Sequence, residues 1–191
     1  MKVIFLDNDG VICLSNNWGG RDKKWAKYRS ANPESSKFLS DAPPSVRFDN
    51  FDVKAVKILN QILDETGAEI VVSSDWKKHA TLDELGDYYI EQGIIKRPIA
   101  TTKSFIGSDK PEGFQWNMSL RYEQERSLEI NQFVKDNPQI THWVAVDDLD
   151  MTWTGTWGVK NFVLTPKTNE GIKQCGVKEK IIAVLNGCDN E

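Results

Sequence analysis

The chain of 191 residues has the length of one ordinary domain, and its 39% hydrophobic and 27% charged residues are typical of a globular protein. Its net charge of −4 argues against a surface that coats nucleic acid, although a local basic patch is compatible with it. No apolar run reaches the ~18 residues of a membrane span, and three cysteines without metal-type spacing favour a reducing, cytoplasmic setting.

The first half of the chain alternates short apolar strands with helices. Residues 3–6 are continuously apolar, which is typical of a parallel strand buried on both faces. Residues 15–48 are polar, aromatic and basic with weak periodicity, so we predict an insertion that forms a cap or flap. A helix over residues 51–66, a buried strand over residues 70–72 and a helix over residues 81–92 follow.

The second half continues the alternation. We expect a short strand near Ile99 and a long loop after it, then a helix over residues 123–135. Two more apolar strands cover residues 143–146 and 161–164, and a last helix covers residues 177–185. This order predicts a single α/β domain over residues 1–191, doubly wound around a mainly parallel sheet.

Three of the predicted strands end in polar side chains. These are Asp7 and Asp9, Ser73 and Ser74, and Asp147 and Asp148. Because ligands bind outside the carboxyl ends of strands in an open parallel sheet, we expect the three ends to form one site. Clustered carboxylates repel one another unless a cation is present, and hard oxygen ligands favour Mg²⁺. The predicted cofactor is Mg²⁺, with the candidate ligands Asp7, Asp9, Asp147 and Asp148.

The motifs resemble those of the haloacid dehalogenase (HAD) superfamily. VIFLDNDGV is similar to its first motif, IVVSSDW to its second and WVAVDD to its fourth. The third motif is a lone basic residue at a helix start, for which Arg126 in ERSLEI is the candidate and Lys103 and Lys110 are the substitutes. SSDWK followed by RSLEI also resembles the small HAD domains with an SSxWR signature, some of them fused in RNA-repair proteins. Lys77 stands where that subgroup usually has Arg.

The resemblance implies a phosphomonoesterase that works through an aspartyl-phosphate. Asp7 would attack phosphorus, and Asp9 would protonate the leaving oxygen and later activate water. The resemblance also implies that Asp9 binds the metal through its backbone carbonyl. Ser73 would donate a hydrogen bond to a phosphoryl oxygen, and Arg126 would balance the negative charge. Gly10 would let the chain turn sharply after the strand.

Several of these residues have ordinary structural alternatives. Of the acid pair, Asp148 is the expected direct ligand, and Asp147 would support it or bind through water; alternatively, the pair caps a helix. Either Ser73 or Ser74 fits the second motif, and either can cap the next helix. Arg126 would otherwise be an exposed helix residue paired with a glutamate.

Basic residues alternate with aromatic ones in the insertion, a pattern that can hold phosphates and stack bases. We therefore expect the substrate to be a nucleotide or a terminal phosphate of a nucleic acid, without a membrane or an obligate protein partner. The alternatives are a small-metabolite phosphatase, in which the flap only covers the site, and a non-catalytic phosphate-binding module. The residues predicted to bind substrate are Gly10, Trp18, Trp25, Ser74 and Lys77.

Overall fold

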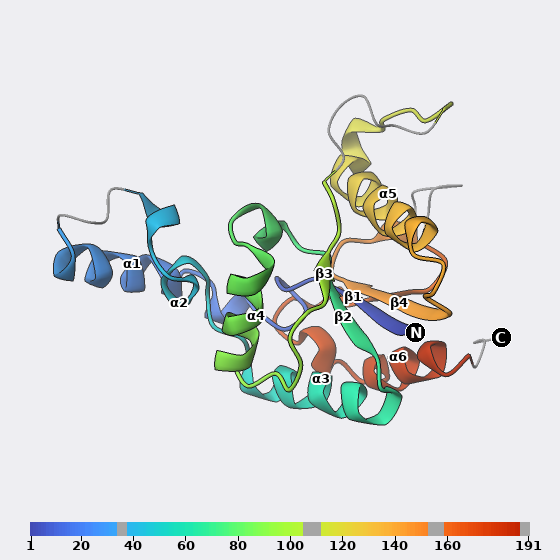
Figure 1. Cartoon of the computed structure of the whole chain (residues 1–191), viewed down its shortest axis with the longest axis horizontal. Helices are drawn as coiled ribbons and strands as arrows, with labels where there is room; N and C mark the ends of the chain where they lie inside the picture. Colours follow the sequence, from blue (N-terminus) through green and yellow to red (C-terminus); the bar gives the residue numbers. More distant parts are fainter. Residues whose placement is uncertain (34–37, 105–111, 153–158, 188–191) are drawn as a thin grey trace.

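The computed structural model of the chain describes residues 1–33, 38–104, 112–152 and 159–187, and its centre is a five-stranded sheet (Figure 1). All four pairs of neighbouring strands are parallel, in the order β3-β2-β1-β4-β5, which confirms the predicted sheet. The strands are β1 (Lys2–Leu6), β2 (Glu69–Val72), β3 (Ala100–Thr101), β4 (His142–Asp147) and β5 (Phe162–Leu164).

Helices cover both faces of this sheet (Figure 1). Successive side chains of a strand point to opposite faces, so Ile4 and Leu6 of β1 enter one core cluster while Val3 and Phe5 enter the other. The doubly wound architecture is therefore confirmed. The first face is covered by α3 (Val53–Thr66), α4 (Leu82–Glu91) and α6 (Val177–Leu185), and the second by α5 (Arg121–Asp136).

Local capping explains where the predicted helices begin and end. The Asp52 side chain accepts a hydrogen bond from the Ala55 amide at the start of α3, and Gly67, with a φ of 68°, ends that helix. Thr81 and Glu84 form a capping box at the start of α4. Both helices lie within their predicted ranges. In the described part of the chain, none of the helices is long and apolar enough to span a membrane.

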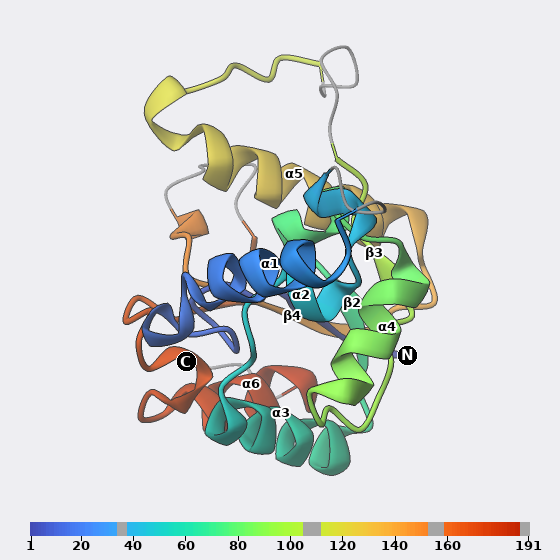
Figure 2. The same ribbon diagram turned by 90° about the vertical axis from the view of Figure 1, so that its left-hand side faces the viewer.

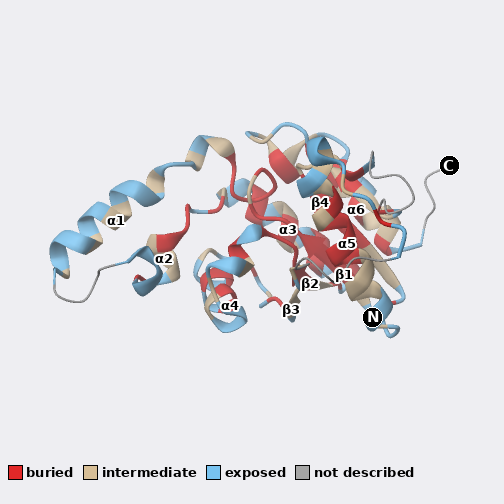
Figure 3. Cartoon of the chain, turned by 90° about the horizontal axis from the view of Figure 1, so that it is seen from above, coloured by how far each residue is buried: buried red, intermediate tan, exposed pale blue. Residues whose placement is uncertain are grey.

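The segment over residues 15–48, predicted to be an insertion, contains helices α1 (Gly20–Ala31) and α2 (Pro44–Arg47), and we call it the flap. It lies beyond the carboxyl ends of the strands, in front of the sheet in Figure 2. None of the residues of α1 is buried (Figure 3), which explains the weak hydrophobic periodicity of this segment. The short 3₁₀ turns are η1 (Ser15–Asn17), η2 (Leu39–Asp41), η3 (Asp75–Lys78), η4 (Met118–Leu120) and η6 (Gly171–Lys173).

The strand order places a switch in topology beside β1. The chain passes from β1 to β2 and β3 on one side, and then returns to β4 on the other side of β1. In open α/β sheets, ligands bind in the crevice at such a point. The ends of the three strands are tied together there, because the Asp7 amide donates to the Val146 carbonyl at 3.0 Å and the Ser73 amide donates to the Leu6 carbonyl at 2.9 Å.

Candidate active site

Three carboxylates meet where β1 and β4 end. The strand register pairs Leu6 with Val146, so Asp7 lies next to Asp147 at the end of the adjacent strand. One carboxylate oxygen from each of Asp7, Asp147 and Asp148 lies within 4.8 Å of the others. Asp7 and Asp147 are buried and Asp148 is half-buried. Parallel strand pairing thus brings together acids that are 140 residues apart in the chain.

Arg126 of α5 is the cation that faces these acids. Its Nη1 lies 3.1 Å from Asp7 Oδ1 and 2.8 Å from Asp147 Oδ2, and it also donates to the carbonyl of Ser73. Burial alone would lower the pKa of Arg126, but the charges of Asp147 and Asp7 outweigh it and raise the pKa. The arginine is therefore a buried partner of the acids, not the exposed helix residue of the alternative interpretation.

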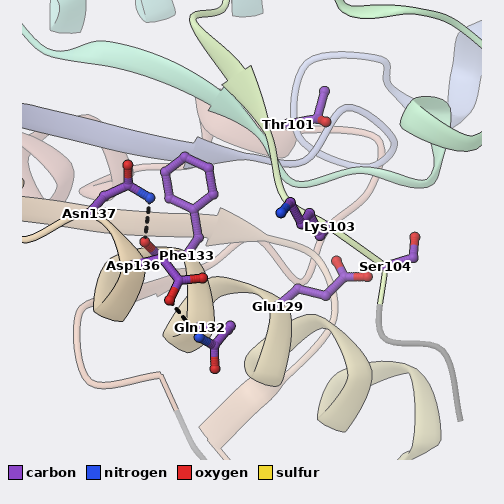
Figure 4. A pocket seen from close by; sticks show the side chains of 8 residues that line it. All are labelled: Thr101, Lys103, Ser104, Glu129, Gln132, Phe133, Asp136 and Asn137. Atoms are coloured by element: carbon purple, nitrogen blue, oxygen red, sulfur yellow. Dashed lines mark hydrogen bonds between the residues drawn. The ribbon is translucent and has the colours of Figure 1, made fainter. Parts of the chain in front are cut away.

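Of the two substitutes for Arg126, the structure describes Lys103 alone. Lys103 lines a pocket of about 410 Å³ that lies between the end of β3 and α5 (Figure 4). Lys110 falls outside the described residues. Of the three candidates for the third motif, Arg126 is the one that the structure pairs with Asp7.

The two serines after β2 differ in their contacts. Ser74 Oγ accepts a hydrogen bond from the Trp76 amide at 3.5 Å and so caps η3. Ser73 Oγ is buried and has no hydrogen-bond partner among the described residues. An unpaired buried hydroxyl is costly, and a phosphoryl oxygen at this edge of the sheet would satisfy it. This geometry favours Ser73 over Ser74 for the second motif.

Asp9 is turned away from the carboxylate cluster. Its Oδ2 accepts a hydrogen bond from Trp76 Nε1 at 2.8 Å. Burial and then the neighbouring Asp7 raise the pKa of Asp9, while the Trp76 bond opposes them. A carboxyl group that keeps its proton closer to neutral pH suits acid–base chemistry. Trp76 is a functional candidate that the pattern SSDW does not single out, since a tryptophan after a strand is more often core.

Gly10 makes room for Asp148. Its φ is +70°, and a Cβ on this residue would lie 2.3 Å from Asp148 Oδ2. The glycine is thus required both by its backbone conformation and by the close approach of the acid. Gly10 is predicted to turn the chain and to bind substrate, and in the structure it lies against the side chain of Asp148.

Lys77 lies in a buried ion pair. Its amine contacts Glu129 and lies 2.8 Å from Thr102 Oγ1, and the two charged side chains are only 4% and 3% exposed. Glu129 is one turn after Arg126 on α5. Lys77, predicted to bind substrate, therefore links η3 to the helix that carries Arg126.

A pocket of about 420 Å³ opens beside Asp9, and we call it the flap pocket. Trp18 and Trp25 do not line it: Trp18 Nε1 donates to the Cys13 carbonyl at 3.3 Å, and Trp25 stacks on Tyr28 with ring centroids 6.2 Å apart. The lining residues are Asp9, Arg21, Leu39, Ser40, Arg47, Phe48, Asp75, Trp76, Lys78 and His79.

The donor set at the strand ends fits a hard divalent cation. Three carboxylates face one guanidinium, which leaves an excess of negative charge. Burial, and then the charge of Asp7, raise the pKa of Asp148 to about 6. Carboxylate oxygens that repel one another in this way are stabilised when they bind Mg²⁺. Asp7, Asp147 and Asp148 are therefore the side chains that would hold it.

Comparison with known families agrees with this geometry. The family described as the HAD domain in Swiss Army Knife RNA repair proteins matches residues 3–176, which include the candidate site and all five strands except the first residue of β1. The chain therefore belongs to this HAD family, as its motifs indicate. No curated protein and no solved structure matches the chain. Membership of this family supports a role of the hydrolase or phosphatase type.

The carboxylate cluster predicts that the metal-free protein gains stability as the pH falls from about 7 to about 5. The pKa of Asp148 in the folded chain, about 6, exceeds the ~3.9 of an unfolded aspartate. The folded chain therefore binds this proton more tightly, and it loses that advantage as the pH rises through the folded pKa. We expect an effect on the order of 1 kcal/mol, because solvent screens the half-buried group.

Thermal denaturation against pH, with and without Mg²⁺, measures this effect. Saturating Mg²⁺ should flatten the dependence because the cation replaces the proton, and Asp148→Asn should flatten it without metal. A metal-free protein that becomes steadily more stable from pH 5 to pH 7 would contradict the assignment of Asp148.

The buried pair predicts that Lys77→Met destabilises the fold by about 3–5 kcal/mol, because it leaves Glu129 charged and unpaired. The double variant Lys77→Met with Glu129→Leu should recover most of this free energy of unfolding, measured with urea. Lys78→Met, a neighbour whose side chain is 41% exposed, is the control. A stable double variant with a strongly raised KM would instead support the predicted contact of Lys77 with substrate.

Proposed function

We propose that the chain is a Mg²⁺-dependent phosphomonoesterase that works through an aspartyl-phosphate on Asp7. The observation that carries this proposal is the contact of the Asp7 carboxylate with Arg126, 3.1 Å away, at the edge of a three-carboxylate cluster. This arrangement supplies a nucleophile and a positive group at the same point, which phosphoryl transfer requires.

The reaction divides into two displacements. In the first, an oxygen of Asp7 forms a bond to phosphorus while the bond to the leaving oxygen breaks, and Asp9 donates a proton to that oxygen. In the second, water attacks the phosphorus, Asp9 takes a proton from the water, and the bond to Asp7 breaks. Inorganic phosphate leaves, and both acids return to their initial state.

The remaining groups stabilise the charge that is transferred. Arg126 and the Ser73 hydroxyl would contact phosphoryl oxygens, the first as a cation and the second as a donor that has no partner among the described residues. Asp7, Asp147 and Asp148 would hold Mg²⁺, which would supply further positive charge at the phosphoryl group. Members of the superfamily generally use this ion.

For the substrate, we propose a nucleotide or a terminal phosphate of a nucleic acid. Membership of a family of RNA-repair HAD domains supports this class. The size of the flap pocket also supports it, because about 420 Å³ suits a leaving group larger than a small metabolite. The alternative of a non-catalytic module is disfavoured, since both Asp7 and Asp9 are present.

The mechanism predicts that Asp7→Asn lowers the rate with an aryl phosphate at least ~10³-fold, because an amide cannot form the acyl phosphate. Removal of divalent ions with a chelator should abolish turnover by the wild type, and added Mg²⁺ should restore it. Unchanged circular dichroism of the variant is the control for folding. An Asp7→Asn variant with normal rates would exclude the covalent mechanism.

Trp76→Phe should lower kcat about ten-fold, because the Asp9 carboxyl loses the N–H that orients it. The aromatic stack with Phe48 is retained. Loss of this bond removes an interaction that lowers the pKa of Asp9, so the pKa rises and the alkaline limb of the pH–rate profile moves to higher pH. If Asp9→Asn is inactive while Trp76→Phe has a normal profile, Trp76 does not position the acid.

A further inference from the structure

The flap pocket lies beside Asp9, the residue proposed to protonate the leaving oxygen. Asp9 lines this pocket, whereas Asp7, Asp147 and Asp148 do not. Because an acid that protonates a leaving oxygen must lie beside it, the rest of the leaving group extends to the Asp9 side of the site. On the basis of the proposed function, we infer that the flap pocket binds the leaving group. This group is a nucleoside that bears a further phosphate, and Arg21 binds that phosphate.

The floor of the pocket is apolar and rigid. Phe48 and Trp76 are buried there, and their rings stack with centroids 4.2 Å apart and planes at 6°. Leu39 of the flap adds an aliphatic surface that is 38% exposed. Because Trp76 also stacks on Phe51 and the two rings are nearly buried, they offer their edges, together with Leu39, as the apolar surface for a sugar or base, which a small, fully hydroxylated leaving group would not use.

Basic side chains surround this floor, and they differ in whether they are already paired. Lys78 lies 2.9 Å from Asp75, in an exposed ion pair. Arg47 is buried and contacts Glu84 and the His79 carbonyl, yet its Nε has no hydrogen-bond partner among the described residues. Both cations are thus already paired within the protein, and the buried Nε of Arg47 is closed to a ligand, so an anion in the pocket needs another basic side chain.

Arg21 is the basic residue best placed to hold that anion. Its side chain is exposed at the pocket and forms no ion pair with the described residues. Its backbone is fixed, because the buried Asp49 accepts hydrogen bonds from the amides of Gly19 and Arg21 at 3.1 and 2.7 Å. The guanidinium is near enough to Asp9 to oppose the rise in that group's pKa. An anion at Arg21 would thus lie close to the reacting phosphate but separate from it.

The two anions would then be two phosphates of one substrate. The phosphate that reacts binds at Asp7, Ser73 and Arg126, and a second phosphate of the leaving group binds at Arg21. A strand end satisfies this requirement through its first phosphodiester, and a nucleoside 3′,5′-bisphosphate satisfies it whichever of its two phosphates is hydrolysed. A nucleoside monophosphate does not satisfy it.

The decisive comparison is kcat/KM for a nucleoside 3′,5′-bisphosphate divided by kcat/KM for the matched 3′- or 5′-monophosphate. We expect the wild type to prefer the bisphosphate about ten-fold, as one charged hydrogen bond predicts. Arg21→Gln should reduce this ratio to about one. A ratio is used because any effect of Arg21 on Asp9 acts on both substrates and cancels.

Arg29→Gln is the matched control, because Arg29 lies exposed on the same helix but does not line the pocket. It should leave the ratio unchanged. If Arg21→Gln leaves the ratio unaltered, the assignment of Arg21 is wrong. If Arg29→Gln lowers the ratio as much as Arg21→Gln does, the effect is one of general charge, and the assignment is also wrong.

Binding by an inactive variant separates this proposal from the proposed function. In the Asp7→Asn background with Mg²⁺, Arg21→Gln should weaken calorimetric binding of the bisphosphate about ten-fold, and Arg29→Gln should not. Failure of the wild type to hydrolyse any phosphate would contradict the proposed function, while this binding result would still decide on the pocket. Equal Kd values for the Arg21 and Arg29 variants would overturn the pocket assignment even in an active enzyme.

Discussion

The site depends on one buried charge balance. Asp7, Asp147 and Asp148 would repel one another at the ends of adjacent strands if Arg126 did not lie between the first two. A buried guanidinium with two carboxylate partners is stable, whereas any one of these groups alone would be costly. The remaining negative charge suits a divalent cation. The proposed nucleophile and the acids proposed to bind the metal are thus held by the same interaction.

That balance has structural requirements beyond the sheet. Arg126 reaches the strand ends only if the first half of α5 is held against η3, and the buried pair of Lys77 and Glu129 provides such a connection. The carbonyl of Ser73 accepts a hydrogen bond from the same arginine, so the end of β2 is held as well. The second motif, through Lys77 and the Ser73 carbonyl, and the fourth motif, through Asp147, therefore help to hold Arg126, the residue of the third motif. This explains why a lysine in the second motif can be important without touching substrate.

The sequence predicts the sheet and the carboxylates well, for physical reasons. Short continuous apolar runs are typical of strands covered on both faces, and the polar ends of parallel strands lie at the same edge of the sheet. The flap is much harder to predict, because α1 has no buried face and therefore no periodicity. Composition shows that Trp18 and Trp25 are present, but not that other side chains line the pocket beside Asp9. Which residues of an exposed segment face the site depends on tertiary contacts, such as those of Asp49, that leave no pattern in the sequence.

In the proposed mechanism, chemistry on phosphorus and selection of the leaving group belong to different parts of the fold. The sheet and α5 provide the groups proposed to act on phosphorus, while the flap and η3 surround the flap pocket. The two regions meet at Asp9 and Trp76, which share a hydrogen bond. The flap begins a few residues after Asp9, and the intervening turn is fixed because the Asn8 carbonyl accepts hydrogen bonds from the amides of Val11, Ile12 and Cys13. On this proposal, sequence changes in the exposed part of the flap would alter which leaving group is accepted without disturbing the buried charge balance. They would reach the reacting centre through Asp9, the acid proposed to protonate that group.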